Sequence, residues 1–188
     1  MKKYMLSCLL LVCGTASAYQ YLYAPWRTDY ILNTGHKPVV SYDKESCVFC
    51  ERIAAHADDV HFILHRAKHH IVILNRYPYN TGHLLIMPYA HSANLDDLSD
   101  DARFELIELV TRSVQVLKKR LDAHAVNVGI NLGSAAGAGI PAHLHVHLVP
   151  RWERDTGFLD TCAETKLVSV DLVKVYEQLK ICFEALEV

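Results

Sequence analysis

The sequence has no excess of charge of either sign, because 19 lysine and arginine residues stand against 21 aspartate and glutamate residues. This balance argues against a protein that holds nucleic acid through a broad basic surface. The sequence contains no internal repeat and no low-complexity tract. It also lacks the Gly-Lys-Ser/Thr ending of a P-loop, which excludes that mode of phosphate binding.

Hydrophobic residues and histidine, by contrast, are plentiful. Hydrophobic residues occupy 51% of the 188 positions, which is enough for the core of one domain and argues against a disordered chain. Histidine occurs 12 times. Because histidine binds metals and exchanges protons near neutral pH, this abundance directs attention to metal sites and proton chemistry.

Residues 1–18 have the layout of a secretory signal peptide. Lys2 and Lys3 form a basic start, Leu6 to Val12 is an apolar run, and small residues follow from Thr15 to Ala18. The apolar run is too short for a stable spanning helix, so we expect no lasting membrane span. The signal predicts export to the periplasm, whereas a misassigned start codon would leave the protein in the cytoplasm.

The rest of the chain divides into an arm and a domain. Residues 19–46 are irregular and rich in aromatic residues, which predicts an N-terminal arm that lies on the domain. We expect the domain to span residues 47–188. It opens with Cys47-x-x-Cys50, which has two interpretations: half of a zinc site in a reducing compartment, or a disulfide after export.

Strands and helices are mixed along the domain without a regular βαβ alternation, which predicts an α+β fold with a mostly antiparallel sheet. His69 and His70 flank the second predicted strand and are expected at its edge. A C-terminal helix is predicted over residues 168–186. Short apolar runs closed by turn residues predict strands over residues 61–65, 69–75, 82–88, 126–132 and 143–149.

One long helix is predicted to follow Ser99, whose side chain suits an N-cap. Apolar residues then recur at three- and four-residue steps, which predicts one buried stripe and an opposite, charged face in solvent. The expected stripe is Phe104, Ile107, Val110, Val114, Leu117 and Leu121, and the expected charged face carries Glu105, Glu108, Arg112, Lys119 and Arg120.

Three alternate histidines stand in the last predicted strand. Because successive side chains of a strand point to opposite faces, His143, His145 and His147 share one face, about 6.5–7 Å apart from one to the next. Leu144 and Val146 share the other face and are expected in the core. A solvated polar face would also alternate, but such faces usually mix Lys, Glu, Thr and Ser. Three imidazoles on one face therefore indicate a chemical site.

A loop of small residues, Gly133 to Gly139, directly precedes these histidines. With few side chains in the way, its backbone N–H groups, as far as Ile140, can approach an anion closely. The loop and the histidines together predict a site for an anionic ligand.

With these motifs the sequence resembles the histidine-triad (HIT) nucleotide hydrolases and transferases. His143-Leu-His-Val-His147 matches the H-x-H-x-H signature of that family, and residues 75–88 resemble its ribose-side strand and loop. The resemblance extends over residues 22–160. Residues 24–27, 47–50, 127–133 and 150–152 resemble its bacterial branch, which is related to diadenosine tetraphosphate phosphorylases.

The resemblance implies a HIT-like fold and a nucleotidyl-histidine mechanism. His145 would attack the α-phosphate of a nucleotide phosphoanhydride such as a dinucleoside polyphosphate, and water or inorganic phosphate would then release the nucleotide. His147 would contact the phosphate or the leaving group, and backbone donors that include Gly139 and Ile140 would hold the developing charge. The other site residues implied are His143 in the triad, with Asn75 and Asn131 binding the nucleotide.

One position departs from the family pattern. Many relatives carry Gln, Ser or Thr four residues before the first triad histidine, where this sequence has Gly139. Activation of the leaving group would therefore depend on the backbone or on His147.

The resemblance also implies a structural zinc site and a homodimer whose sheets join across the subunits. Two cysteines and two histidines, Cys47, Cys50, His91 and His143, suit a closed tetrahedral zinc site. Two other functions stay open: a nucleotide- or zinc-binding protein without turnover, and a nucleotidyltransferase that uses another acceptor.

Overall fold

The computed structural model describes residues 43–157, 160, 162 and 171–186. The expected signal peptide (1–18) and most of the expected aromatic arm (19–46) lie outside the described residues. No helix in the described part of the chain is long and apolar enough to cross a membrane.

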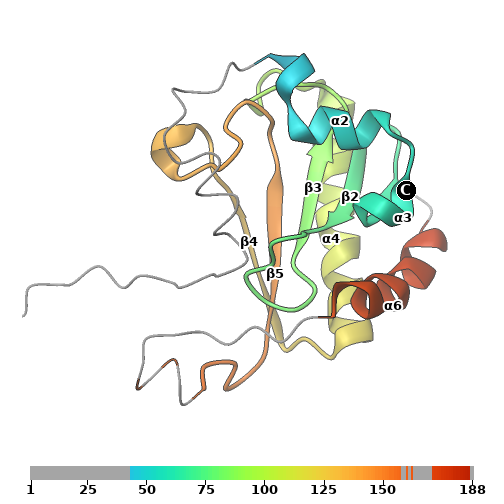
Figure 1. Cartoon of the computed structure of the whole chain (residues 1–188), viewed down its shortest axis with the longest axis vertical. Helices are drawn as coiled ribbons and strands as arrows, with labels where there is room; N and C mark the ends of the chain where they lie inside the picture. Colours follow the sequence, from blue (N-terminus) through green and yellow to red (C-terminus); the bar gives the residue numbers. More distant parts are fainter. Residues whose placement is uncertain (1–42, 158–159, 161, 163–170, 187–188) are drawn as a thin grey trace, which may run out of the picture.

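Five antiparallel strands form one sheet in the order β1-β2-β3-β5-β4, which confirms the predicted α+β class (Figure 1). The first strand begins later than predicted, because Asp58–His61 forms the short helix α3 and Phe62 turns the chain with a left-handed φ of 57°. The strands are β1 (Ile63–Arg66), β2 (His70–Leu74), β3 (Leu84–Pro88), β4 (Ala125–Ile130) and β5 (Val146–Arg151).

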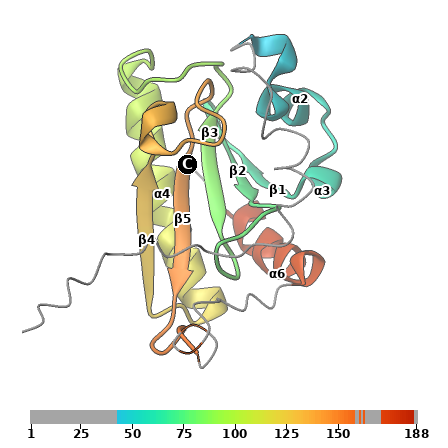
Figure 2. The same cartoon turned by 60° about the vertical axis from the view of Figure 1, so that its left-hand side comes forward.

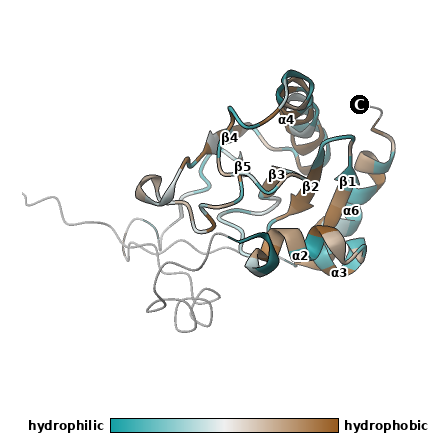
Figure 3. Ribbon diagram, turned by 90° about the horizontal axis from the view of Figure 1, so that it is seen from above, coloured by the Kyte–Doolittle hydropathy of each residue, from teal (hydrophilic) through white to brown (hydrophobic). Residues whose placement is uncertain are grey.

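Helices cover both faces of this sheet. Viewed from above, α4 (Asp100–Leu121) lies on one side of the sheet, and α2 (Val48–Ala54) lies with α3 on the other (Figure 3). The C-terminal helix α6 (Leu172–Glu184) packs against α4 and β1 (Figure 2). Its presence confirms the predicted C-terminal helix. The face under α4 and α6 holds the larger apolar core, and the face under α2 holds a smaller one.

The long helix is capped as predicted, with the Ser99 side chain accepting a hydrogen bond from the Ala102 N–H. The predicted buried stripe is correct at Leu117, which is buried, and at Val110, Val114 and Leu121, which pack against the core. It is wrong at Phe104 and Ile107, which are 77% and 64% exposed. A neighbouring stripe with the same spacing, which shares Leu117, faces the sheet, so the period alone could not choose between them. That stripe consists of Ala102, Glu105, Leu106, Leu109, Ser113 and Leu117.

Glu105 was expected in solvent and is instead buried beneath the sheet. Its Oε1 accepts hydrogen bonds from the His69 N–H at 2.8 Å and from the His70 ring at 2.9 Å. The expectation of an edge position is also wrong for His70, which lies within β2 and is 0% exposed. A charged residue can occupy the core here because its charge meets two donors.

The last strand is shorter than predicted. It begins at Val146, and His143 and His145 precede it. The physical reason is that backbone groups before Val146 bond elsewhere: the Leu144 N–H donates to the Ser92 carbonyl. The predicted division of faces still holds, because Leu144 and Val146 are buried in apolar clusters.

Candidate active site and metal centre

A cavity of about 270 Å³ lies between α2 and the sheet. Apolar residues of α2, β2 and β3 form one part of its wall. His147 of β5, His145 just before that strand, and the small-residue loop form another part. His143 does not line this cavity. Six of the predicted site residues do line it: Asn75, Asn131, Gly139, Ile140, His145 and His147.

His145 is held so that one ring nitrogen is left for chemistry. Its Nδ1 lies 2.8 Å from the His143 carbonyl oxygen, and because a carbonyl only accepts, Nδ1 carries the proton. The other nitrogen, Nε2, is then unprotonated in the neutral ring. Burial lowers the pKa of His145 against the opposing effect of this hydrogen bond, which favours the neutral ring. Phe49 of α2 packs on the ring at a centroid distance of 5.3 Å.

His147 is oriented by His83, which the sequence analysis did not assign to the site. The Tyr79 N–H donates to His83 Nδ1 at 3.1 Å, so His83 Nε2 carries the proton of the neutral ring. That nitrogen lies 3.0 Å from His147 Nδ1 and donates to it. His147 therefore carries its own proton on Nε2, and the ring can serve as a hydrogen-bond donor or an acid.

The two catalytic candidates lie side by side. The centroids of the His145 and His147 rings are 4.9 Å apart. One ring offers an unprotonated nitrogen and its neighbour offers a protonated one. This pairing of a nucleophile with a donor is what displacement at phosphorus needs from two imidazoles.

The small-residue loop reaches the cavity only in part. Gly137, Gly139 and Ile140 line the cavity, whereas Gly133 does not. The N–H groups of Ala136 and Gly137 donate within the loop's own turn. Fewer backbone N–H groups of residues 133–140 can therefore donate to an anion than the sequence predicts. Gly139 presents only backbone to the cavity.

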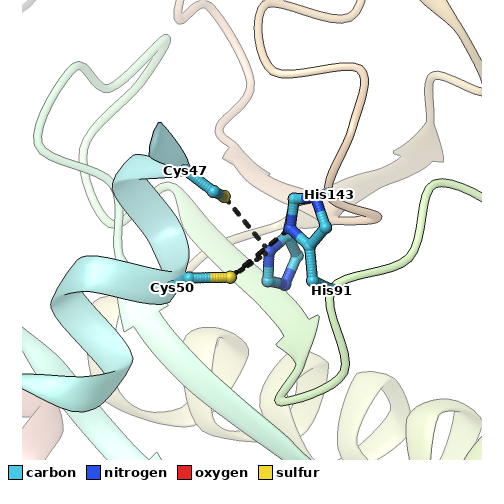
Figure 4. Close-up of side chains that lie close together, drawn as sticks. All are labelled: Cys47, Cys50, His91 and His143. Atoms are coloured by element: carbon cyan, nitrogen blue, oxygen red, sulfur yellow. Dashed lines mark hydrogen bonds between the residues drawn. The ribbon is translucent and has the colours of Figure 1, made fainter. Parts of the chain in front are cut away.

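A separate cluster holds the four residues of the expected metal site. The ligand atoms of Cys47, Cys50, His91 and His143 all lie within 4.8 Å of one another (Figure 4). His143 Nδ1 lies 3.4 Å from Cys47 Sγ and 3.5 Å from Cys50 Sγ, and His91 Nδ1 lies 3.4 Å from Cys50 Sγ. Cys47 and Cys50 are free thiols in the structure, so the disulfide interpretation finds no support in it.

This donor set fits a tetrahedral metal ion. Zinc–sulfur and zinc–nitrogen bonds of ~2.3 and ~2.0–2.1 Å imply S···N edges of about 3.6 Å, close to the observed separations. His143 Nε2 donates to the Pro88 carbonyl at 2.9 Å, so its Nδ1, which faces the sulfur atoms, is the unprotonated nitrogen. Burial, with the neighbouring Cys47, raises the pKa of the Cys50 thiol to about 11. A metal ion would offset that cost by binding the thiolate.

Comparison with known proteins agrees with this geometry. The HIT domain family model matches residues 57–154. A protein of Mycobacterium tuberculosis (strain H37Rv) named AP-4-A phosphorylase is 33% identical over 155 residues, which are 82% of this chain and 80% of that protein. An asymmetrical bis(5'-nucleosyl)-tetraphosphatase of Schizosaccharomyces pombe is 34% identical over 93 residues, half of each chain.

The fold has solved counterparts as well. The crystal structure of a Zn-bound histidine triad family protein from Mycobacterium smegmatis matches with a TM-score of 0.62 and 24% sequence identity. The match covers 76% of this chain and 96% of that one. The resemblance inferred from the motifs is thereby confirmed, and the chain belongs to the HIT domain family.

Proposed function

We propose that the protein cleaves the phosphoanhydride bond of a nucleotide, of the dinucleoside polyphosphate type, through a nucleotidyl-His145 intermediate. The observation that carries the proposal is the pair of oriented rings: His145 Nδ1 donates to the His143 carbonyl, and His147 Nδ1 accepts from His83. The names of the phosphorylase and tetraphosphatase relatives support the substrate class.

In the first step His145 Nε2 attacks the α-phosphorus. A P–N bond forms, the P–O bond to the leaving polyphosphate breaks, and His147 Nε2–H hydrogen-bonds to the departing oxygen or transfers its proton to it. In the second step water or inorganic phosphate attacks phosphorus and the P–N bond breaks. Water gives a nucleoside monophosphate, and phosphate gives a nucleoside diphosphate. Asn75, Asn131, Gly139 and Ile140 line the cavity that would hold the nucleotide.

Intact-protein mass spectrometry after brief mixing with diadenosine tetraphosphate tests this mechanism. We expect a transient mass increase of one adenylyl group, absent from the His145→Gly variant. Chromatography of the products then identifies the acceptor. ADP forms when inorganic phosphate accepts the adenylyl group, and AMP forms when water accepts it. Binding of AMP without adduct or turnover would instead show a binding protein, and turnover only with another acceptor would show a nucleotidyltransferase.

We also propose that the metal held by Cys47, Cys50, His91 and His143 is zinc. Two thiolates and two imidazoles satisfy four-coordinate zinc completely, so its contribution is structural: it links α2 to the chain that carries the triad. Elemental analysis of the purified protein tests this assignment, with an expected one zinc per chain. Another metal, or none, would contradict it.

We further propose the homodimer implied by the family resemblance. The described sheet ends at β4, whose outer edge is unpaired and carries the half-exposed Val128. Phe104 and Ile107 are exposed on α4 as well. An unpaired strand edge and exposed apolar side chains both favour pairing with a second copy. Analytical ultracentrifugation of the unchanged protein and of the Ile107→Glu variant tests this proposal. We expect the mass of a dimer for the unchanged protein and the mass of a monomer for the variant.

A further inference from the structure

One polar side chain of the cavity has no role in the proposed chemistry. Arg52 lines the cavity from α2, and it is the only lysine, arginine, aspartate or glutamate among the described residues that line it. No hydrogen bond or ion pair joins its side chain to another residue in the part of the chain that the structure describes. The donors of this guanidinium are therefore available to a ligand.

The wall around Arg52 is apolar. Val48 and Phe49 precede it by four and three residues, a spacing that puts all three on one face of α2. Ile73 and Leu85 line the cavity from the sheet. Burial is also the first cause that lowers the pKa of Arg52, which agrees with these surroundings. Two apolar walls suit the flat faces of a nucleobase, and the guanidinium then lies where the polar edge of the base can meet it.

The helix α2 begins beside the histidines and runs away from them. Phe49 packs on the His145 ring at a centroid distance of 5.3 Å. At the other end of α2 the Ile53 carbonyl accepts hydrogen bonds from both terminal nitrogens of Arg66 in β1, each at 3.3 Å. Because β2 and β3 separate β1 from β5, the helix crosses the sheet from the histidines toward β1. Arg52 lies three residues beyond Phe49, which is about 4.5 Å further along the helix and away from His145.

The floor of the cavity extends in the same direction. Leu85 of β3 pairs with His147 of β5, and Ile73 of β2 pairs with Leu85 on the other side. Neighbouring strands lie about 4.8 Å apart, so the floor extends about 10 Å from β5 to β2. A nucleotide whose α-phosphate lies at His145 can therefore place its base over Leu85 and Ile73, with one edge toward Arg52.

Position 6 of a purine decides how its edge meets a guanidinium. Arginine carries hydrogen-bond donors and no acceptor. Guanine has an acceptor at this position, O6, whereas adenine has the N6 amino group, which is a donor. O6 and N7 of guanine can accept two hydrogen bonds from one guanidinium. Adenine would set its amino group against the guanidinium and leave part of the arginine buried without an acceptor.

We propose that Arg52 selects the nucleobase by donating to O6 and N7 of guanine, so that the cavity prefers guanine nucleotides to adenine nucleotides. The inference rests on the proposed function, because it takes the α-phosphate to lie at His145. It names the base, which the proposed function leaves open. Arg52 is then a specificity-determining residue at the end of the nucleotide opposite to the reacting phosphate.

Calorimetric titration of the full chain with AMP, GMP and IMP tests the proposal, because IMP keeps O6 and N7 of guanine but lacks the 2-amino group. We expect GMP and IMP each to bind about tenfold or more tightly than AMP, as one bidentate contact between arginine and guanine allows. In Arg52→Leu, which extends the apolar wall, AMP should still bind and the affinities for GMP and AMP should become equal. In Arg112→Leu, a matched change in α4 on the opposite side of the sheet (Figure 3), the preference for GMP should not change.

The outcomes separate this inference from the proposed function. Equal affinity of the unchanged protein for AMP and GMP would overturn the role of Arg52 and leave the proposed function intact. A preference for GMP that IMP does not share would overturn it too, because the base would then be recognised at its 2-amino group, a donor that arginine cannot bind. A preference for GMP that persists in Arg52→Leu would assign the selection to another residue. If no nucleotide binds, the proposed function fails together with the inference.

Discussion

The buried carboxylate of Glu105 should be one of the most sensitive positions of α4. Glu105 Oε1 accepts from the His69 N–H and from His70 Nδ1, and the His70 ring is 0% exposed. Burial works to raise the pKa of Glu105, but these hydrogen bonds outweigh it and hold the pKa below its usual value. Burial lowers the pKa of His70, so an ionised carboxylate meets a neutral ring.

Glu105→Ala removes two hydrogen bonds to a charged group, each contributing about 1.5–3 kcal/mol, and leaves a buried N–H unsatisfied. We expect the free energy of unfolding to fall by about 3–5 kcal/mol, which lowers the Tm by about 10 °C in a chain of this length. Urea and thermal unfolding of the full chain measure both. Glu108→Ala is the matched control, because Glu108 makes only a surface pair with Arg112, of about 0–1 kcal/mol.

Equal stability of the Glu105→Ala and Glu108→Ala variants would refute this account of the core. Glu105→Gln adds a graded test, since both hydrogen bonds go to Oε1 and an amide oxygen can accept both, but without the negative charge that strengthens them. We expect it to lose less stability than Glu105→Ala. A larger loss for Glu105→Gln would show that its hydrogen bonds are not what stabilises this position.

Three further predictions concern the site and the turn beside it. Because burial lowers the pKa of His145, the acid limb of adduct formation should fall below the ordinary imidazole value of 6.5, and a limb above 6.5 in the pH profile would contradict this. Cys50→Ser should lower both bound metal and Tm, measured by elemental analysis and thermal unfolding, whereas Cys182→Ser should keep the metal. Gly82→Ala should cost about 1–3 kcal/mol in urea unfolding, because φ is +75° and the new Cβ would collide with Leu121; parent-like stability would argue against that close contact.

The sequence predicts the strands and the triad well because their signals are local. Alternation over two residues separates Leu144 and Val146 from the histidines whatever the rest of the chain does, and the structure keeps that separation. The four residues of the metal cluster were also predicted. His91 was associated with the Cys47–Cys50 pair only through the family resemblance, because no local spacing connects them. The ligand atoms come together from α2 and two distant loops.

The errors arise where only tertiary contacts decide. Two stripes on α4 have the same spacing, and the sheet selects the one that contains Glu105 because His70 lies opposite it. His83 could not be assigned to the site from the sequence, because its role depends on a contact with His147 across 64 residues. Arg52 also lines the cavity, and no local pattern indicates this, because only the fold brings α2 beside β2 and β3.

The proposed metal cluster and the proposed nucleophile are linked through His143, and this constrains what a structural metal could do. His143 turns Nδ1 toward the cysteines and donates Nε2–H to the Pro88 carbonyl, while its own carbonyl accepts from His145 Nδ1. The contact that fixes the tautomer of His145, the proposed nucleophile, is thus made by the backbone of His143, a proposed metal ligand.

The same cluster holds the start of α2, whose Phe49 packs on the rings of both His143 and His145. Loss of the metal would free the thiols of α2 and one side of the His143 ring together. The apolar wall of the cavity and the His143 carbonyl that orients His145 would then both be held less rigidly. A metal that touches no reacting atom should therefore change both nucleotide affinity and the rate of adduct formation, and single-turnover kinetics of Cys50→Ser would measure the two separately.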